Sequence, residues 1–465
     1  MSLQIFDSVK KEKVKFESLE DKKARVYVCG PTVYDDAHLG HARSAIAFDL
    51  LHRVLLLNGY KVDMVKNFTD IDDKIIKKMQ SENKSLEEIT TYYIKRYKED
   101  MDALNILENT IEPKATTNLD AMINMINNLL DKGIAYIIED GVYFEVSKDR
   151  DYGSLSKQIS DDSIARVEEK ASKKDQKDYA LWKFSKDDEV GFDAPFGRGR
   201  PGWHIECSAM IDRHLASDNS EYSIDIHAGG ADLLFPHHEN EASQSRCATG
   251  KNLAKYWMHN GFVNIDGNKM SKSLGNSFFL KDALQQYHGE VIRFYMSSTH
   301  YRGDFNFNEE DLLSSKKRLD KLYRLKKRVY GLGGSSVNKE FKKKVTESLN
   351  DDINISQALS VVDEFVSYSN EELDTTPKNK ALKKEIVSNL EFISNTLAIC
   401  TQDAYKYFQF GISEAEINKI EELIEKRSEA KKNKDYELSD KIRDEILSLN
   451  VQIMDTANGT LWEKI

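Results

Sequence analysis

Two histidines three residues apart, His38 and His41, enclose Leu39 and Gly40 shortly after a run of apolar residues. The pattern predicts that a helix begins here, where unpaired backbone N–H groups and the helix dipole attract phosphate. Gly40 would let a ligand approach the backbone closely, and the two imidazoles can donate hydrogen bonds to phosphate oxygens as negative charge develops. Taken alone, the two histidines also fit a structural or solvent-exposed role.

A second candidate for phosphate chemistry is the Lys-Met-Ser-Lys-Ser segment at residues 269–273, which lies between Gly267 and Gly275. Its two cations, Lys269 and Lys272, stand on a loop that can close over a triphosphate. A solvated turn is the alternative. The segment follows the last strand expected in its half of the sheet, which would turn it toward the histidine pair.

Four further residues have side chains of the chemical types that zinc sites use: Cys29, Cys207, His237 and Glu241. His237 and Glu241 are four residues apart, so they can share one face of a helix. Two thiolates, an imidazole and a carboxylate can complete the shell of a zinc ion, and the carboxylate is the ligand most able to loosen. Taken singly, each cysteine also fits a small buried hydrophobic residue, and the His–Glu pair fits a hydrogen-bonded surface pair.

The elements that must position these residues form two blocks with one β–α–β pattern. The expected ranges are 25–29 (strand), 42–57 (helix) and 61–68 (strand), then 224–228 (strand), 240–249 (helix) and 256–265 (strand). Two such halves predict an α/β protein with a split, Rossmann-like parallel sheet that binds a nucleotide.

Other segments extend this core. A helix at residues 117–132 and a hairpin at 134–146 that turns at Asp140-Gly141 indicate an insertion between the halves. The chain reads as helical after residue 308. We expect the tail to hold a mixed-charge helical run from 413 to 450 and then an irregular end.

The composition is that of a large globular protein, with 465 residues, 40% hydrophobic content and a formal net charge of −11. The chain has no run of eighteen apolar residues, and residues 1–10 lack the character of a targeting segment, so we expect a cytoplasmic protein with no membrane partner. The net charge argues against nonspecific nucleic-acid binding over the whole surface. The four cysteines make no disulfide framework, and Cys247 and Cys400 are expected to be inert.

The histidine and lysine segments resemble the HIGH and KMSKS signatures of class I aminoacyl-tRNA synthetases. The resemblance implies catalytic roles for His38, His41 and Lys272, and ATP contacts from these residues, Gly40 and Lys269. Gly230 and Asp232 resemble the ribose-contacting segment of that class, which makes them further ATP-binding candidates. For Asp232, a helix cap is the alternative.

Three segments, residues 29–34, 199–210 and 235–241, resemble the motifs of cysteinyl-tRNA synthetases. The resemblance covers nearly the whole chain and is weakest at residues 168–196. It implies one Zn²⁺ per chain held by Cys29, Cys207, His237 and Glu241, and a cysteine pocket lined by Gly30, Thr69, Trp203 and His227. His204 and His238 adjoin these positions and are expected to support them.

The resemblance implies an ATP-dependent cysteine–tRNA ligase. L-Cysteine would react with ATP, accompanied by Mg²⁺, to give cysteinyl-adenylate and pyrophosphate, and cysteine would then pass to the 3′ end of tRNA(Cys). Zinc would bind the substrate thiolate and select against serine. We expect a monomer.

The implied domain organisation has five parts. They are residues 1–118 (first half of the catalytic domain), 119–200 (connective insertion), 201–310 (second half, with the lysine-rich segment), 311–404 (helical tRNA-binding bundle) and 405–465 (anticodon-binding region). A phosphate track is expected on the helix after residue 308, which concentrates basic residues. They are Lys316, Lys317, Arg318, Lys321, Arg324, Lys326, Lys327 and Arg328. A solvated helix face is the alternative.

Three other functions fit the sequence less well. A cysteine ligase acting on an amino sugar would keep the catalytic domain, but the long helical C-terminal region argues against it. A noncatalytic tRNA-binding relative would have eroded phosphate motifs, whereas His38, His41 and Lys272 are all present. A zinc hydrolase is disfavoured because His237 and Glu241 lack a hydrolase spacing.

Overall fold

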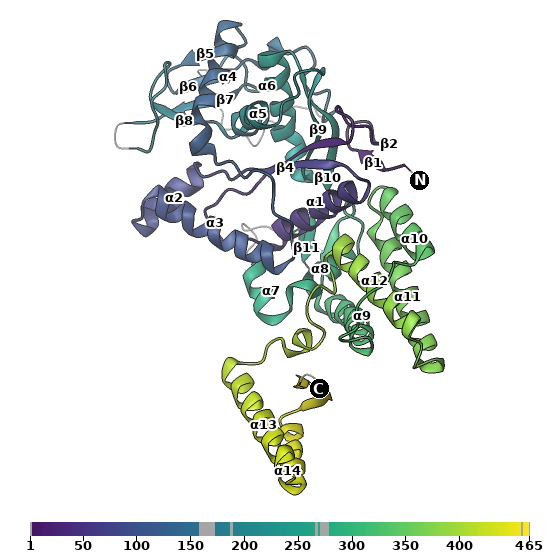
Figure 1. Ribbon diagram of the computed structural model, residues 1–465. Coiled ribbons are helices and arrows are strands. Elements are labelled where there is room, and N and C mark those ends of the chain that lie inside the picture. Colours follow the sequence, from purple (N-terminus) through teal and green to yellow (C-terminus); the bar gives the residue numbers. More distant parts are fainter. Residues whose placement is uncertain are drawn as a thin grey trace. The chain divides into compact units, whose positions relative to one another are not determined.

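The computed structural model describes residues 2–157, 173–186, 189–265, 268–269, 279–456 and 459–464 (Figure 1). The chain divides into two compact units. The first comprises Met1–Lys281, Met296–Asn308 and Thr346–Ala358, and the second comprises Asp282–Tyr295, Glu309–Val345 and Leu359–Ile465. The five-part division expected from the sequence stays a prediction.

The described residues form fifteen strands and fourteen α-helices, with short 3₁₀ turns between them. The strands are β1 (Gln4–Asp7), β2 (Glu12–Lys15), β3 (Lys23–Val28), β4 (Lys61–Lys66), β5 (Ala135–Ile138), β6 (Gly141–Phe144), β7 (Tyr179–Phe184), β8 (Gly199–Pro201), β9 (Tyr222–Gly230), β10 (Asn252–Asn260), β11 (Val263–Ile265), β12 (Asn268–Lys269), β13 (Phe305–Phe307), β14 (Val451–Thr456) and β15 (Gly459–Lys464). The helices are α1 (Leu39–Leu57), α2 (Asp73–Glu82), α3 (Leu86–Ala103), α4 (Leu119–Asp131), α5 (Trp203–His214), α6 (Glu239–Thr249), α7 (Leu280–Gln286), α8 (Gly289–Ser297), α9 (Glu309–Arg328), α10 (Lys339–Asn350), α11 (Ile355–Thr375), α12 (Lys380–Leu397), α13 (Glu414–Lys432) and α14 (Tyr436–Ser448).

The two β–α–β blocks form one parallel sheet in the order β10-β9-β3-β4. The strands are rich in buried apolar residues, as expected where both faces of a parallel sheet are covered. The strand order reverses between β3 and β9, and open α/β sheets bind ligands beyond the carboxyl ends of the strands at such a point. The Rossmann-like α/β class is therefore confirmed.

One expected strand is wrong in detail. Residues 256–265 do not form a single strand, because β10 ends at Asn260 and β11 pairs with β13 in a separate sheet. The break falls at Gly261, where an added Cβ would lie 2.5 Å from the carbonyl oxygen of Gly303. Apolar residues lie on both sides of this point, but Asn260-Gly261 between them is a dipeptide that marks turns, so the sequence held a signal for the break.

The insertion forms an antiparallel sheet in the order β5-β6-β7-β8, which confirms the expected hairpin at its start. Its buried residues share a core with the parallel sheet, since Trp182 and Phe144 belong to the same apolar cluster as Tyr27 and Ile224. The insertion is therefore built into the first unit.

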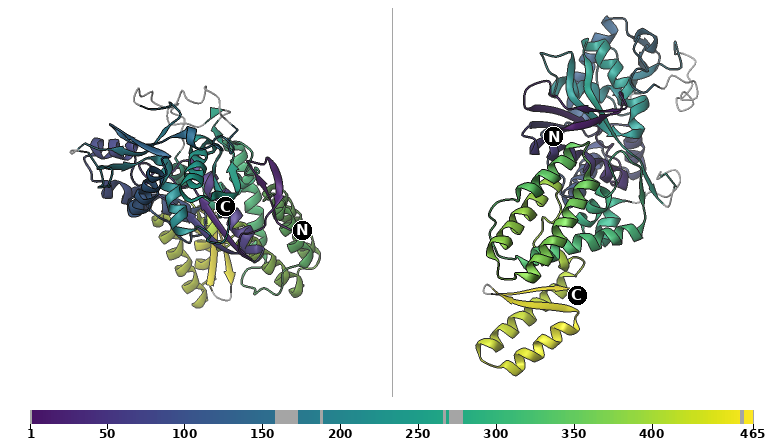
Figure 2. Two further views of the ribbon diagram at one scale, coloured as in Figure 1. Left: turned by 90° about the horizontal axis from the view of Figure 1, so that it is seen from above. Right: turned by 90° about the vertical axis from the view of Figure 1, so that its right-hand side faces the viewer.

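The C-terminal end also differs from expectation. It is not irregular, because β14 and β15 pair as an antiparallel hairpin. Its strands pack against the helix pair α13 and α14 (Figure 2), with Val451 and Trp462 in an apolar cluster that includes Ile420 and Ile446. The helices supply the apolar surface that makes so short a hairpin stable.

No helix among the described residues is both long enough and apolar enough to cross a membrane.

Candidate functional site

The expected phosphate-binding turn lies at the start of α1. His38 is the N-cap residue, and its Nδ1 accepts a hydrogen bond from the backbone N–H of Gly40 at 3.1 Å. The Nδ1 of His41 accepts from the backbone N–H of His38 at 3.2 Å, and the two rings stack with centroids 3.8 Å apart. A neutral imidazole that accepts at Nδ1 carries its proton on Nε2. The capping contacts thus orient two N–H donors, so a structural and a phosphate-binding role are compatible here.

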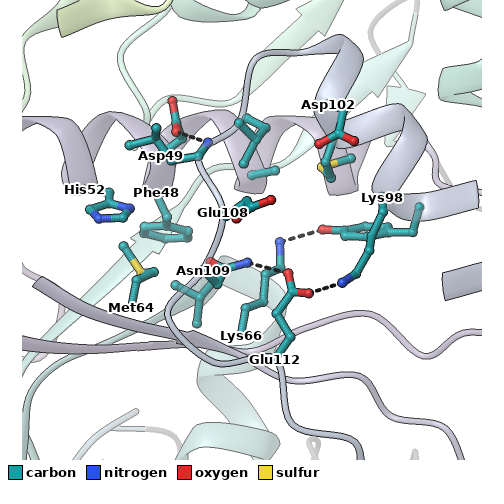
Figure 3. Close-up of a pocket in the computed structure, with 16 residues that line it drawn as sticks. Phe48, Asp49, His52, Met64, Lys66, Lys98, Asp102, Glu108, Asn109 and Glu112 are labelled. Carbon is teal, nitrogen blue, oxygen red and sulfur yellow. Dashed lines mark hydrogen bonds and ion pairs between the residues drawn. The ribbon is translucent and has the colours of Figure 1, made fainter. Parts of the chain in front are cut away.

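Helix α3 contacts this turn through Tyr97. The Tyr97 ring meets the His41 ring edge-on, with centroids 6.4 Å apart, and the Tyr97 hydroxyl accepts a hydrogen bond from Lys66 at 2.6 Å. A cavity of about 280 Å³ lies between α1, β4 and α3 (Figure 3), where Lys98 and Asn109 both contact Glu112. None of the expected site residues lines this cavity.

A buried carboxyl on α3 yields a stability prediction. Asp100 is 6% exposed, its Oδ2 has no hydrogen-bond partner among the described residues, and burial raises its pKa from 3.8 to about 6. Because the pKa is higher in the folded than in the unfolded state, stability is lost as the pH rises through this interval. At pH 7.5 we expect Asp100→Asn to raise the free energy of unfolding by about 1–3 kcal/mol. Near pH 4 the same substitution should change the free energy of unfolding little.

Urea denaturation of the native protein and of the Asp100→Asn variant, at pH 4 and at pH 7.5, measures the effect of the substitution on the free energy of unfolding. An equal effect of the substitution at pH 4 and pH 7.5 would contradict the assignment of the titration to Asp100.

The four expected metal ligands meet beyond the carboxyl ends of β3 and β9. Cys29 follows β3, Cys207 lies on α5, His237 lies in the turn before α6, and Glu241 lies in the first turn of α6. The Sγ atoms of Cys29 and Cys207 are 3.8 Å apart, and His237 Nε2 lies 3.8 Å from Cys207 Sγ and 2.8 Å from Glu241 Oε1. These donors could hold a metal ion.

The charges of this cluster favour a cation. Hydrogen bonding with the Cys29 thiol, and to a smaller extent with His237, lowers the pKa of Cys207 to about 6. Burial raises the pKa of Cys29 well above its usual value. Burial opposes a charged imidazole at His237, but Glu241 and Cys207 raise its pKa to about 10. Buried acidic donors of this kind bind a metal ion with release of their protons.

Three histidines that were not expected as ligands surround the cluster. His238 Nε2 lies 3.3 Å from Cys29 Sγ, and its Nδ1 lies 2.8 Å from Nε2 of His259. His204 Nδ1 lies 2.9 Å from the Nδ1 of His237. These contacts fit the expected supporting role of His204 and His238, whereas no sequence motif indicated His259, a strand residue of β10.

The expected cysteine-pocket residues border the same cluster, with different exposure. Trp203 is 43% exposed and stacks on His237 with ring centroids 4.1 Å apart. Thr69 is buried and donates a hydrogen bond to Glu206 at 2.7 Å. Gly30 has no room for a side chain, because an added Cβ would lie 1.5 Å from the carbonyl oxygen of Asn67. Among these residues, Trp203 therefore offers the most accessible surface.

His227 holds a different position from the other pocket candidates. It is completely buried, stacks on Trp257 with centroids 4.8 Å apart, and its Nε2 lies 2.6 Å from Glu241 Oε2. The side chain thus orients the carboxylate of Glu241.

The ribose-contact candidates lie at the end of β9. Gly230 occupies the N-cap of a 3₁₀ turn, and Asp232 lies within that turn, so Asp232 is not the cap residue. Of the lysine-rich segment, the backbone of Lys269 belongs to β12, while Lys272 lies outside the described residues.

Most basic side chains of helix α9 form ion pairs or hydrogen bonds within the second unit. Carboxylates or backbone carbonyls of the second unit pair with Lys316, Arg318, Lys326, Lys327 and Arg328. Lys317, Lys321 and Arg324 are exposed and have no such partner among the described residues. Their spacing of four and three residues sets them on one face of the helix.

Comparisons with known proteins agree with this arrangement. The family model for the class I (C) tRNA synthetase catalytic domain matches residues 15–317. The methionyl-tRNA synthetase of Mycobacterium tuberculosis in complex with methionyl-adenylate has a similar fold, with a TM-score of 0.61 and 14% identity over 81% of this chain and 92% of that chain. The parallel sheet, the histidine turn at α1 and the match to the family model define a class I aminoacyl-tRNA synthetase.

Full-length relatives narrow the assignment. The cysteine–tRNA ligase of Aliarcobacter butzleri is 66% identical over 465 residues, which are 100% of both chains. The cysteine–tRNA ligase of Helicobacter pylori strain G27 is 58% identical over 99% of both. The chain belongs to the cysteine–tRNA ligase family.

Proposed function

We propose that this protein activates L-cysteine with ATP and transfers it to tRNA(Cys). A carboxylate oxygen of cysteine attacks the ATP α-phosphate, pyrophosphate leaves, and a ribose hydroxyl of the terminal adenosine then attacks the cysteinyl carbonyl and releases AMP. The Nε2–H groups of His38 and His41 donate to the phosphates, and catalysis rests on position and charge stabilisation. We infer that Mg²⁺ accompanies ATP and that the protein works as a cytoplasmic monomer.

One observation carries this proposal. Cys29, Cys207 and the His237–Glu241 pair come from three separate segments and converge at the sheet edge where α1 also begins. A metal-binding donor set beside a phosphate-binding turn suits a reaction that joins a thiol-containing amino acid to a nucleotide. The identity to full-length cysteine–tRNA ligases supports the same conclusion.

The donor set fits zinc in particular. Two Zn–S bonds of about 2.3 Å at a tetrahedral angle hold their sulfur atoms about 3.8 Å apart. The two Sγ atoms are 3.8 Å apart here. When bound, zinc would supply a soft Lewis acid that lowers the pKa of the substrate thiol and favours sulfur over the hydroxyl of serine. Trp203 and His227 would then shape and orient the site around the substrate.

The direct test is cysteine-dependent ATP–pyrophosphate exchange, followed by charging of purified tRNA(Cys). We expect both activities, with little exchange when serine replaces cysteine. Exchange that does not depend on cysteine would overturn the proposal. Charging of an amino sugar in place of tRNA would support the alternative ligase.

The unpaired cations of α9 predict where tRNA contacts this unit. We expect the combined change Lys317→Gln, Lys321→Gln and Arg324→Gln to weaken tRNA(Cys) binding and to reduce the slope of log affinity against log salt concentration by about 2 to 3, because each lost phosphate contact removes roughly one released counterion. Cysteine activation should stay unchanged.

Binding measured at several salt concentrations tests this. Lys316→Gln is the control on the same helix, because Lys316 is already paired with Asp320 at 2.8 Å. A salt slope that is equal for the triple variant and the native protein would exclude this face as a phosphate contact.

A further inference from the structure

Asp36 lies two residues before His38 and joins two helices. Its side chain is largely buried, with Oδ1 accepting a hydrogen bond from Arg96 Nε of α3 at 2.9 Å. Its Oδ2 accepts from Lys281 Nζ of α7 at 2.6 Å. One carboxylate thus ties the chain just before α1 to two elements that are remote in sequence.

Backbone contacts run beside these ion pairs. The carbonyl oxygen of Ala37 accepts a hydrogen bond from the N–H of Leu280 at 2.8 Å, and His38 forms an antiparallel bridge with Phe279. Phe279 follows directly after residues 270–278, which carry Lys272. The residues that follow the lysine-rich segment are therefore paired by backbone contacts with the histidine turn.

We propose that Asp36 is a positioning residue for cysteine activation: through Lys281 it holds Phe279–Lys281, the residues that follow the lysine-rich segment, beside His38, while Arg96 holds the carboxylate in place. The inference rests on the proposed function, because the step affected is adenylate formation. Asp36 itself contacts no substrate in this role. Without the ion pair, Phe279–Lys281 would be held beside the histidine turn by backbone contacts alone, and a displacement of about 1 Å in a positioned group can slow a reaction by about a hundredfold.

The alternative is that these ion pairs only stabilise the fold. Partly exposed ion pairs contribute about 0–1 kcal/mol, so their loss would lower the thermal midpoint slightly and leave the chemical step alone. A positioning role therefore predicts a change in the rate of adenylate formation, whereas a purely stabilising role predicts a change in the thermal midpoint alone.

Single-turnover formation of cysteinyl-adenylate separates them. With Asp36→Asn and with Lys281→Met, we expect the rate at saturating ATP and cysteine to fall by about 10- to 100-fold, with the KM for cysteine within about twofold of the native value. Lys281→Arg keeps the charge and should restore most of the rate. The double variant Asp36→Asn/Lys281→Met should be no slower than the slower single variant, because both changes remove the same Asp36–Lys281 ion pair.

Asp120→Asn is the matched control, since it removes an exposed ion pair with Arg213 (2.6 Å) in the same unit and should leave the rate unchanged. Unchanged rates in Asp36→Asn and Lys281→Met, or a rise in the KM for cysteine equal to the loss of rate, would overturn the positioning role. A native protein that forms no adenylate would overturn the proposed function instead.

Discussion

Replacing Cys207 with serine is expected to remove zinc and cysteine activation together. The Cys207 side chain is buried and contacts both Cys29 and His237, so the change leaves the donor set with one sulfur. A hydroxyl is a harder and much less acidic donor than a thiol, and it binds zinc poorly. We expect zinc content to fall from about one per chain to near zero, and cysteine activation to fall by more than about a hundredfold.

His237→Ala should have the same effect, because the imidazole contacts Cys207 and Glu241. Cys247→Ser is the control on the helix that carries Glu241, since Cys247 is not among the proposed metal ligands. Metal analysis and ATP–pyrophosphate exchange measure the two losses, and ATP binding measured by calorimetry should suffer less than either.

The same variants test how the enzyme rejects serine. A pocket that relied on size alone would reject a near-isostere by only about a hundredfold. A folded, zinc-free protein that still activated cysteine and still rejected serine strongly would show that the metal is structural, and the proposed basis of selection would be wrong.

Lys272→Ala is expected to slow adenylate formation by about a hundred- to a thousandfold, with a smaller effect on cysteine binding. The lysine is proposed to stabilise charge that grows on the phosphates in the transition state, and loss of one such contact costs about 2.7–4 kcal/mol. Single-turnover kinetics measures the chemical step, and the KM for cysteine measures binding.

Lys95→Ala is a suitable control, because Lys95 is 77% exposed on α3. An unchanged chemical step in Lys272→Ala would remove the lysine from the catalytic assignment. A loss of cysteine binding as large as the loss of rate would instead indicate a role in the ground state.

The sequence by itself determined the local features of this protein. Apolar runs and turn residues predicted both halves of the parallel sheet, and the histidine segment predicted the start of α1, because a strand or a helix start depends on neighbouring residues. The donor types at Cys29, Cys207, His237 and Glu241 are compatible with zinc, and the resemblance to cysteinyl-tRNA synthetases grouped them as ligands before any geometry was known.

Only the tertiary structure decided which residues meet. The contacts of His227 with Glu241, of His238 with His259 and of Asp36 with Lys281 join elements that the sheet brings together. The pairing of α9 cations and the hairpin of β14 and β15 likewise depend on partners elsewhere in the chain. A residue pattern encodes the face of its own helix or strand, whereas the partner of a buried charge is set by the packing of distant segments.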